Sequence, residues 1–297
     1  MQRFPPLVAN IGSYASLPLT HVRLTTTSPG GCGVLSGQVE LRPPYLGVLS
    51  LRENNRVEVF DAGGLVWRGR LEERAATIQA GSAVWEFTAL GYAASLRDQV
   101  YAVSTTFAAG TAIETIFTTA RDNLAPDIST DNSLVVATSR MLSALSVDVI
   151  GLSAGQVMDN AMLIGNSGNN RLYWHVWEGS IGSGNLAALE LIARPTTPEY
   201  SIGLDQGAIV EINWALARLY NRVVVRWGSP ASYTVRNDLA SQGAAPDGYG
   251  VIRSLLTTNN LINSTTDAQR VGDSLLTQYA QIRPIARRIR IPASAGI

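Results

Sequence analysis

The alternation of apolar and charged side chains is clearest between residues 56 and 72, where it runs through two successive segments. Arg56–Val59 and Leu65–Glu72 both follow the two-residue period of half-buried strands. Asp61–Gly64 joins them and contains two glycines, which tolerate the positive φ of a tight turn. The pattern therefore predicts a β-hairpin.

A third strand is predicted directly after this hairpin. Its Trp85 and Phe87 fall on one face, and we expect Trp85 to meet Trp67 of the hairpin across neighbouring strands. Arg68 points the opposite way from Trp67, so we expect it to be exposed and to matter for partner binding. The residues predicted to form the core or an interface are Trp67, Trp85, Phe87, Tyr92 and Trp227.

The hairpin Arg56–Gly69, the strand after it and the segment Gly91–Asp98 form one continuous module. This module resembles the central hub protein of tailed-phage tail tips and baseplates, a family with counterparts in contractile injection systems. The resemblance implies a homotrimer in which each subunit gives two similar β-barrels to a pseudo-sixfold ring around the tail channel. It also implies as partners a distal tail or tube protein ring, a spike or fibre protein and a tape measure protein, with DNA passing through the lumen without specific binding.

The middle of the chain has helical periodicity. Thr111 and Glu114 have the spacing of a capping box before an apolar stripe that ends at Pro126. A second box-like start lies at Ser153, and Gly165 is predicted to end that helix. Strands at 172–177 and 186–192 follow, joined by a glycine-rich segment.

The last part returns to β character. Strands are predicted at 209–214, in the valine-rich 220–228, where Asn221 precedes the valines, and at 286–291. The hub family has a similar valine strand, a loop with a Tyr-Gly step, as in Tyr249–Gly250, and a helix rich in Ala. The helix predicted from Asp267 contains Gly272, a departure that costs about 1 kcal/mol relative to Ala.

These elements predict a mainly β fold with an α+β insertion. The first region should be a small barrel or sandwich. With the hub resemblance, this implies a first tube-type β-barrel at 1–104, an α+β insertion domain at 105–203 and a second tube-type barrel at 204–297. At 297 residues the chain is long enough for several domains with real cores.

The composition is poor in charge, with 15% charged residues and a net charge of zero. A weakly charged surface suits burial against partners, and neutrality argues against broad binding of nucleic-acid backbones. There is no signal-peptide pattern at the N-terminus and no run approaching about 18 apolar residues. We therefore expect a protein made in the cytoplasm and not inserted in a membrane. The hub resemblance implies that it is assembled in the host cytoplasm and works in the virion tail.

Every one of the 23 basic residues is arginine, which excludes Schiff-base, P-loop and Ser-Lys mechanisms that need a lysine. Cys32 is the single cysteine, so no intrachain disulfide can form, and His21 and His175 are the two histidines. No metal-binding motif is present. The sequence thus predicts no catalytic residue, no cofactor and no metal ion, and a protein that is not an enzyme.

Several groups of residues nevertheless allow a chemical interpretation. Cys32 with His21 as base could form a nucleophilic pair, although inert core is the more frequent role of a lone cysteine. Glu72 with Glu73, or Asp61 with Glu86, could be paired glycosidase carboxylates. Glu72 and Glu73 should point to opposite faces of a strand unless a bulge intervenes.

Three further segments have an ordinary structural explanation beside the functional one. Gly30–Gly33 and Gly179–Gly184 could hold a phosphate, but flexible turns account for them better. The aromatic run 173–177 could bind sugars, while alternation would place most of it in the core or an interface. The arginines at 287, 288 and 290 could contact nucleic acid, and a solvated strand face is preferred because the net charge is zero.

The preferred function is a non-enzymatic trimeric hub. The alternatives are a receptor-binding or wall-degrading tail protein that uses the middle domain, and a sixfold distal tail ring.

Overall fold

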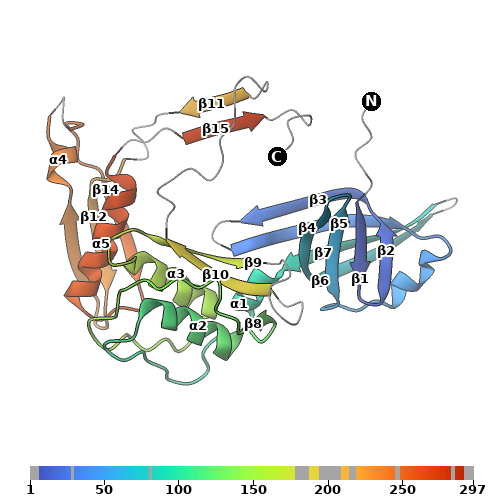
Figure 1. Ribbon diagram of the computed structural model, residues 1–297, viewed down its shortest axis with the longest axis horizontal. Coiled ribbons are helices and arrows are strands. Elements are labelled where there is room, and N and C mark those ends of the chain that lie inside the picture. Colours follow the sequence, from blue (N-terminus) through green and yellow to red (C-terminus); the bar gives the residue numbers. More distant parts are fainter. Residues whose placement is uncertain are drawn as a thin grey trace.

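The computed structural model describes residues 7–27, 30–79, 82–177, 187–193, 209–213, 219–244, 248–281 and 285–290. Three parts follow one another along the long axis of the molecule: a curled sheet, a helical layer and a smaller sheet covered by one helix (Figure 1). This arrangement confirms the mainly β fold with an α+β insertion.

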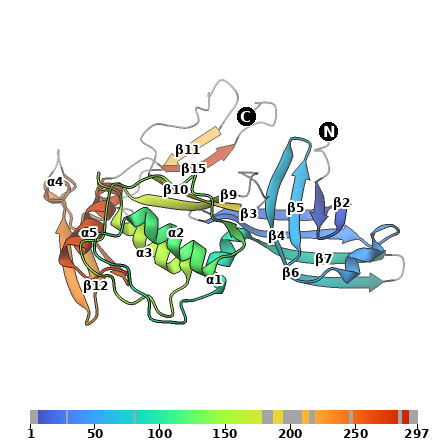
Figure 2. The same cartoon turned by 60° about the horizontal axis from the view of Figure 1, so that its bottom comes forward.

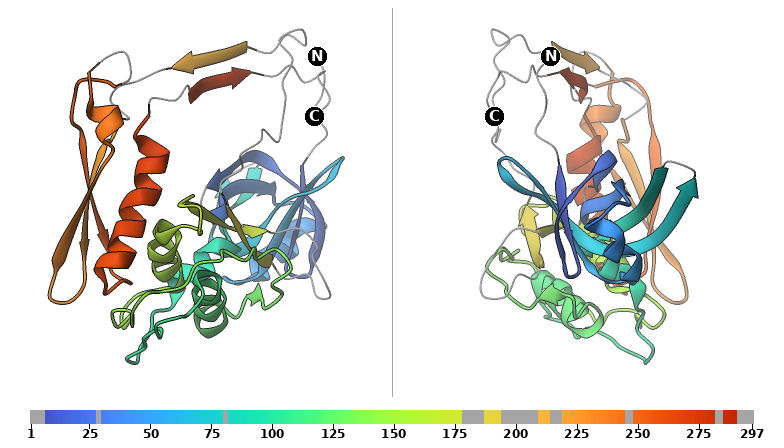
Figure 3. Two further views of the ribbon diagram at one scale, coloured as in Figure 1. Left: turned by 60° about the vertical axis from the view of Figure 1, so that its left-hand side comes forward. Right: turned by 90° about the vertical axis from the view of Figure 1, so that its right-hand side faces the viewer.

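The first sheet is built from seven strands of the N-terminal part. They are β1 (Val8–Ile11), β2 (Tyr14–Pro18), β3 (Thr20–Thr27), β4 (Gly30–Glu40), β5 (Arg56–Asp61), β6 (Gly64–Gln79) and β7 (Ser82–Gly91). The hydrogen-bonded order is β2-β1-β5-β6-β7-β4, and β3 pairs with β4. Because β2 and β3 are consecutive in the chain, the two ends of this order lie close together and the sheet curls on itself, as Figure 3 shows.

The predicted hairpin is β5 with β6, and Asp61 lies opposite Gly64 at its turn. Trp67, Trp85 and Phe87 are all buried inside the curl, and the rings of the last two stack with centroids 5.0 Å apart. Trp67 lies opposite Val59, whereas Trp85 lies opposite Ala76 further along β6. The two indoles therefore share one core cluster without being the cross-strand neighbours we expected.

Two glycines allow three backbones to approach closely where the first sheet ends. Gly69 of β6 lies opposite Gly91 of β7. A Cβ on Gly69 would collide with the carbonyl oxygen of Leu90, and one on Gly91 would collide with that of Cys32. Any other residue at either position would push these strands apart.

The expectation that Arg68 is exposed is wrong, since only 4% of the residue is accessible. Its Nε and Nη2 donate to Oε1 of Glu58 at 2.9 and 2.8 Å, and Glu58 also pairs with Arg56. The turn η2 (Tyr92–Ala94) contacts β6, so the strand has structure on both faces here. Arg68→Ala would leave Glu58 poorly compensated and should disturb folding as well as binding.

The central layer combines helices with the end of the large sheet. Its elements are α1 (Ser95–Asp98), α2 (Ile113–Leu124), β8 (Ile128–Ser129), α3 (Ala154–Ile164), β9 (Leu172–Trp177) and β10 (Ala187–Ala193). Strand β9 pairs antiparallel with β10 and, at Gly30 and Gly31, parallel with β4. The first sheet thus continues into the central layer. A short 3₁₀ turn, η1 (Tyr45–Ser50), lies between β4 and β5.

The two helix starts differ from each other. The box at Ser153 is confirmed, because the Ser153 side chain accepts from the backbone of Gln156 and the Gln156 side chain accepts from the backbone of Ser153. The box at Thr111 and Glu114 is wrong. Glu114 instead accepts hydrogen bonds from the backbone and the hydroxyl of Thr138, which ties the helix to a distant loop.

Buried arginines hold the irregular segments around α2 and α3. Arg121 is fully buried; it pairs with Asp122 and donates to the carbonyl oxygens of Thr130 and Asp131 at 3.3 Å. Arg140 donates to the carbonyl oxygen of Ile164, at the C-terminal end of α3, at 2.9 Å. Arg140 also donates to the carbonyl oxygen of Ser167 at 3.2 Å, so each guanidinium binds more than one backbone carbonyl.

The third part is a three-stranded sheet with one long helix. It contains β12 (Arg222–Trp227), β13 (Ser232–Asn237), α4 (Leu239–Gln242), β14 (Ser254–Asn259) and α5 (Thr265–Tyr279). The order is β13-β12-β14, with β14 parallel to β12. Helix α5 covers one face of this sheet and contacts α3 on its other side (Figure 3).

A separate ribbon pairs β11 (Ile209–Asn213) with β15 (Ile285–Arg290). The predicted strands at 209–214 and 286–291 are thus present, although residues 214 and 291 lie outside the described residues. No helix in the described part of the chain is long and apolar enough to span a membrane.

Gly272 has a packing reason inside α5. A Cβ at this position would overlap the side chain of Arg236 on β13, which pairs with Asp273 at 2.6 Å. Glycine therefore lets α5 lie close against the sheet. The helix itself is confirmed despite the lower propensity of this residue.

Trp67→Ala should lower the free energy of unfolding by about 3–5 kcal/mol, because it removes a fully buried indole from the first core. That is a large share of an ordinary stability of about 5–15 kcal/mol, so the variant should melt well below the wild type. The matched control is Val66→Ala, the neighbouring residue on the exposed side of β6, which should melt within a degree or so of wild type. Equal melting of both variants would contradict this account of the core.

Candidate functional site

A hollow of about 560 Å³ on the first sheet collects carboxylates from several strands. Its charged and titratable walls are His21, Glu53, Glu72, Glu73, Arg74 and Glu86. Strands β6 and β7 supply most of these side chains, while β3 and the segment after η1 supply the rest. Four glutamates therefore line the hollow, against one arginine.

Glu72 and Glu73 reach the same hollow because the strand is irregular between them. Leu71 lies opposite Ala89, but Glu73 lies opposite Thr88, so the register shifts at Glu72. Sequence reasoning expected opposite faces in the absence of a bulge, and the register shift removes that restriction. The alternative pair of Asp61 and Glu86 is not formed, since Asp61 accepts from the backbone of Gly63 at the β5–β6 turn.

The acids of this hollow are open to water. Glu53 pairs with Arg74 at 3.0 Å, and its pKa is lowered by a backbone hydrogen bond and by that guanidinium. Glu86 accepts from Nε2 of Gln38 at 2.7 Å. A glycosidase acid is usually set in an apolar, water-poor pocket, whereas the side chain of Glu72 is 45% exposed. The arrangement suits attraction of a cationic surface better than general acid catalysis.

A smaller pocket of about 220 Å³ lies where β4 meets β9. Cys32, Trp67, His175 and Trp177 are among its walls, and His21 is not. The pairing of β3 with β4 places Cys32 opposite Thr26 and His21 beside the far end of β4. The structure therefore does not form the alternative Cys32–His21 pair, and the histidine that shares a pocket with the thiol is His175.

The surroundings of His175 weaken its charged form. Its Nδ1 lies 3.6 Å from Oε2 of Glu190, too far for a hydrogen bond, and has no hydrogen-bond partner among the described residues. Burial lowers the pKa of His175 below its ordinary value of 6.5, and the negative charge of Glu190 opposes this in part. A neutral imidazole is thus favoured at neutral pH.

The aromatic run of β9 divides as alternation predicts. Trp174 is buried and donates from Nε1 to Oδ1 of Asp159 at 3.0 Å. Tyr173, His175 and Trp177 face the other way, with Trp177 exposed. Tyr173 lies under the guanidinium of Arg171, 5.5 Å from its ring centroid. These rings do not form one flat platform for a sugar.

The other candidate residues do not form a catalytic or ligand-binding site in the described part of the structure. Gly30–Gly33 lies within β4 and precedes no helix, so it does not form a phosphate cradle. The segment Gly179–Gly184 and the side chains at 287, 288 and 290 lie outside the described residues. Within the described ranges no group of three His, Cys, Asp or Glu side chains could hold a metal ion. Tyr92 and Trp227 are half-buried, and Trp227 donates to Thr234 at 2.8 Å.

Sequence reasoning missed two features. Asn221 is fully buried and connects three segments: it donates to the carbonyl oxygen of Val251 at 2.8 Å and accepts from the backbone of Arg253 at 2.9 Å. Tyr233, Val235 and Leu256 form an exposed apolar group on the sheet of the third part. The alternation in 232–237 was the available signal for the second feature.

The sequence matches no protein-family model and no curated protein. Among solved structures, the fold is similar to that of the prophage MuSo2 43 kDa tail protein from Shewanella oneidensis, with a TM-score of 0.58 and 10% identity over 90% of this chain and 76% of that one. It is also similar to that of a tail protein from Neisseria meningitidis MC58, with a TM-score of 0.53 and 12% identity over 90% and 74%. At these identities the likeness concerns the fold.

His175 should titrate below its ordinary value of 6.5, and Glu190→Gln should move its midpoint lower still, because the opposing negative charge is removed. Since the folded-state pKa is lowered, the protein should lose stability as pH falls from 6.5 through that midpoint. NMR titration of the imidazole and melting curves over this range provide the measurements. A midpoint above 6.5, or one that rises in Glu190→Gln, would contradict the burial argument.

Proposed function

We propose that this chain is the structural hub of a phage tail tip or baseplate. In this role it forms a trimeric, pseudo-sixfold ring that joins the tail tube or distal tail ring to the central spike or fibre. Tape measure protein and DNA pass through its lumen, and DNA is not bound specifically. The chain then works in the virion tail, after assembly in the host cytoplasm.

The observation that carries the proposal is the likeness of fold to two tail proteins over 90% of this chain. The curled first sheet, with its continuous core, agrees with the tube-type barrel that the hub resemblance implies. The zero net charge fits a lumen that lets DNA pass rather than binding it. Together these support a structural role in a tail.

One observation favours a second candidate. The acidic hollow brings Glu72, Glu73 and Glu86 together, and a receptor-binding or wall-degrading tail protein could use it to hold a ligand. The exposure of these acids argues for binding rather than hydrolysis. A distal tail ring would also be β-rich, but it would contain six copies of the chain where the hub contains three.

Native mass spectrometry of the assembled protein, or the rotational symmetry of the tail particle, should give three copies. Each subunit would then supply two quasi-equivalent units to a sixfold neighbour. Six copies would assign the chain to the distal tail ring instead. A stable monomer in both measurements would remove the hub function.

The purified chain should hydrolyse neither peptidoglycan nor peptides, because the acids of the hollow are water-exposed and Cys32 lies away from His21. Release of soluble fragments from peptidoglycan is the measurement. Glu73→Gln and Cys32→Ala are the matched variants. Turnover by the wild type that either variant abolishes would favour the degrading tail protein.

A further inference from the structure

The outer face of the β13-β12-β14 sheet, on the side away from α5, carries an apolar row. Val224 of β12 lies opposite Val235 of β13 and Leu256 of β14, so the three side chains are neighbours on one face. Val235 and Leu256 are 51% and 66% exposed, and Tyr233 in the next row is 62% exposed. Apolar groups gathered in this way usually mark a contact surface.

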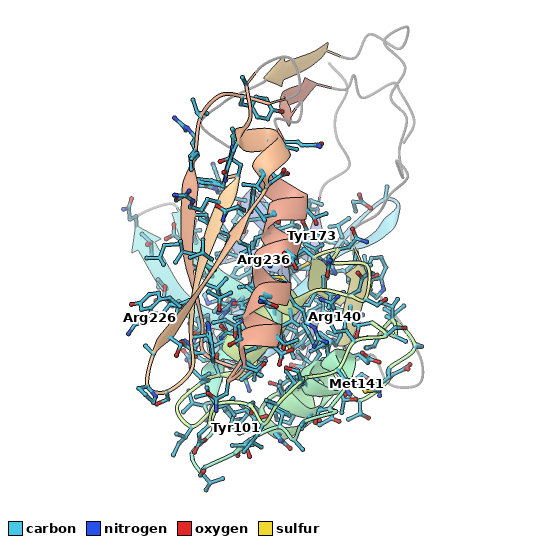
Figure 4. All side chains as sticks on the ribbon, turned by 90° about the vertical axis from the view of Figure 1, so that its left-hand side faces the viewer. Tyr101, Arg140, Met141, Tyr173, Arg226 and Arg236 are labelled. Atoms are coloured by element: carbon cyan, nitrogen blue, oxygen red, sulfur yellow. The ribbon has the colours of Figure 1, made fainter. Side chains whose placement is uncertain are left out.

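This face is also cationic. The three strands contain arginines and no acidic residue. Arg236 turns toward α5 and pairs with Asp273, but Arg222 and Arg226 share the alternate positions with Val224 and so belong to the outer face. In Figure 4, Arg226 lies on the side of the small sheet away from α5. A partner would therefore need apolar and acidic groups together.

The opposite end of the same molecule offers that combination. Strand β5 pairs with β6 only as far as Arg70, while β6 continues to Gln79 against β7. Residues 72–79 are exposed throughout, and the hairpin reaches the far end of the long axis (Figure 2). This acidic arm, residues 72–79 with 82–88, carries Glu72, Glu73 and Glu86 against one cation, Arg74. The pairs Glu73–Thr88, Ala75–Glu86 and Thr77–Val84 place both glutamates and Val84 on one face of the arm.

We propose that the outer face of the β13-β12-β14 sheet binds the acidic arm of a second copy of this chain. Arginines would meet Glu73 and Glu86 of the arm, and the apolar row would cover Val84 on the same face. At about 3.4 Å per residue the eight exposed residues of β6 extend roughly 27 Å and the six-residue strands roughly 20 Å, so the two surfaces have similar lengths.

The contact is heterologous, because one copy contributes the outer sheet face and the other contributes the acidic arm. Such contacts produce a closed ring when the rotation between copies closes, and an open filament when it does not. The inference deepens the proposed hub function and rests on it, since it names the two surfaces through which neighbours in the ring would touch.

Charge reversal on the full-length chain tests the contact. Arg226→Glu and Glu73→Arg should each weaken self-association by about tenfold or more, because each places like charges across the contact. The double variant should restore most of the wild-type association. Thr115→Glu, an exposed position on α2 of the central layer and outside both surfaces, is the control and should associate like wild type. Sedimentation over a concentration series, with melting curves for every variant, gives the readout.

Wild-type association in Arg226→Glu or in Glu73→Arg would overturn the contact while leaving a three-copy ring in place. Failure of the double variant to reassemble would also overturn it. A wild-type chain that stays monomeric at every concentration would also overturn the proposed contact. The copy number in a tail particle tests the hub function separately, so the two proposals can fail independently. Either end can be tested alone if one variant does not fold.

Discussion

The close approach of three backbones at Gly69, Gly91 and Cys32 decides how the large sheet joins the helical layer. Because no side chain separates β6, β7 and β4 there, β4 can pair with β9 while the chain turns at once into η2 and α1. The buried charges at Glu58 and Arg68 lie at the same junction and need its tight geometry to remain paired. The two parts keep separate hydrophobic cores, and one continuous sheet joins them.

At the other end of the molecule, helix α5 joins the small sheet to the helical layer. It packs between the small sheet and α3, and Asp267 near its start is almost fully buried. That carboxylate accepts hydrogen bonds from the backbone and the hydroxyl of Ser143, and it pairs with Arg270. A long irregular segment is thus fixed to α5 by one satisfied buried charge.

Elements with a clear period could be predicted from the sequence alone, including the 56–72 hairpin, both middle helices and the valine strand after Asn221. The misses have physical causes. Arg68 obeys the alternation, but a second layer covers its face, and no local pattern reveals a layer contributed by distant residues. Glu114 has capping spacing, yet the stronger partner is Thr138 from a loop far along the chain. The acidic hollow depends on a register shift at Glu72, which sequence periodicity does not encode.

The exclusive use of arginine has a chemical consequence beyond charge. Arg121 and Arg140 each serve several acceptors from fixed directions, which the compact ammonium of lysine could not do at the same positions. No side chain in the protein is a primary amine, so acylating reagents and enzymes that modify lysine have no side-chain target. Carbodiimide coupling, which joins carboxylates to amines, would activate the glutamates of the arm and find no amine side chain on a neighbouring copy.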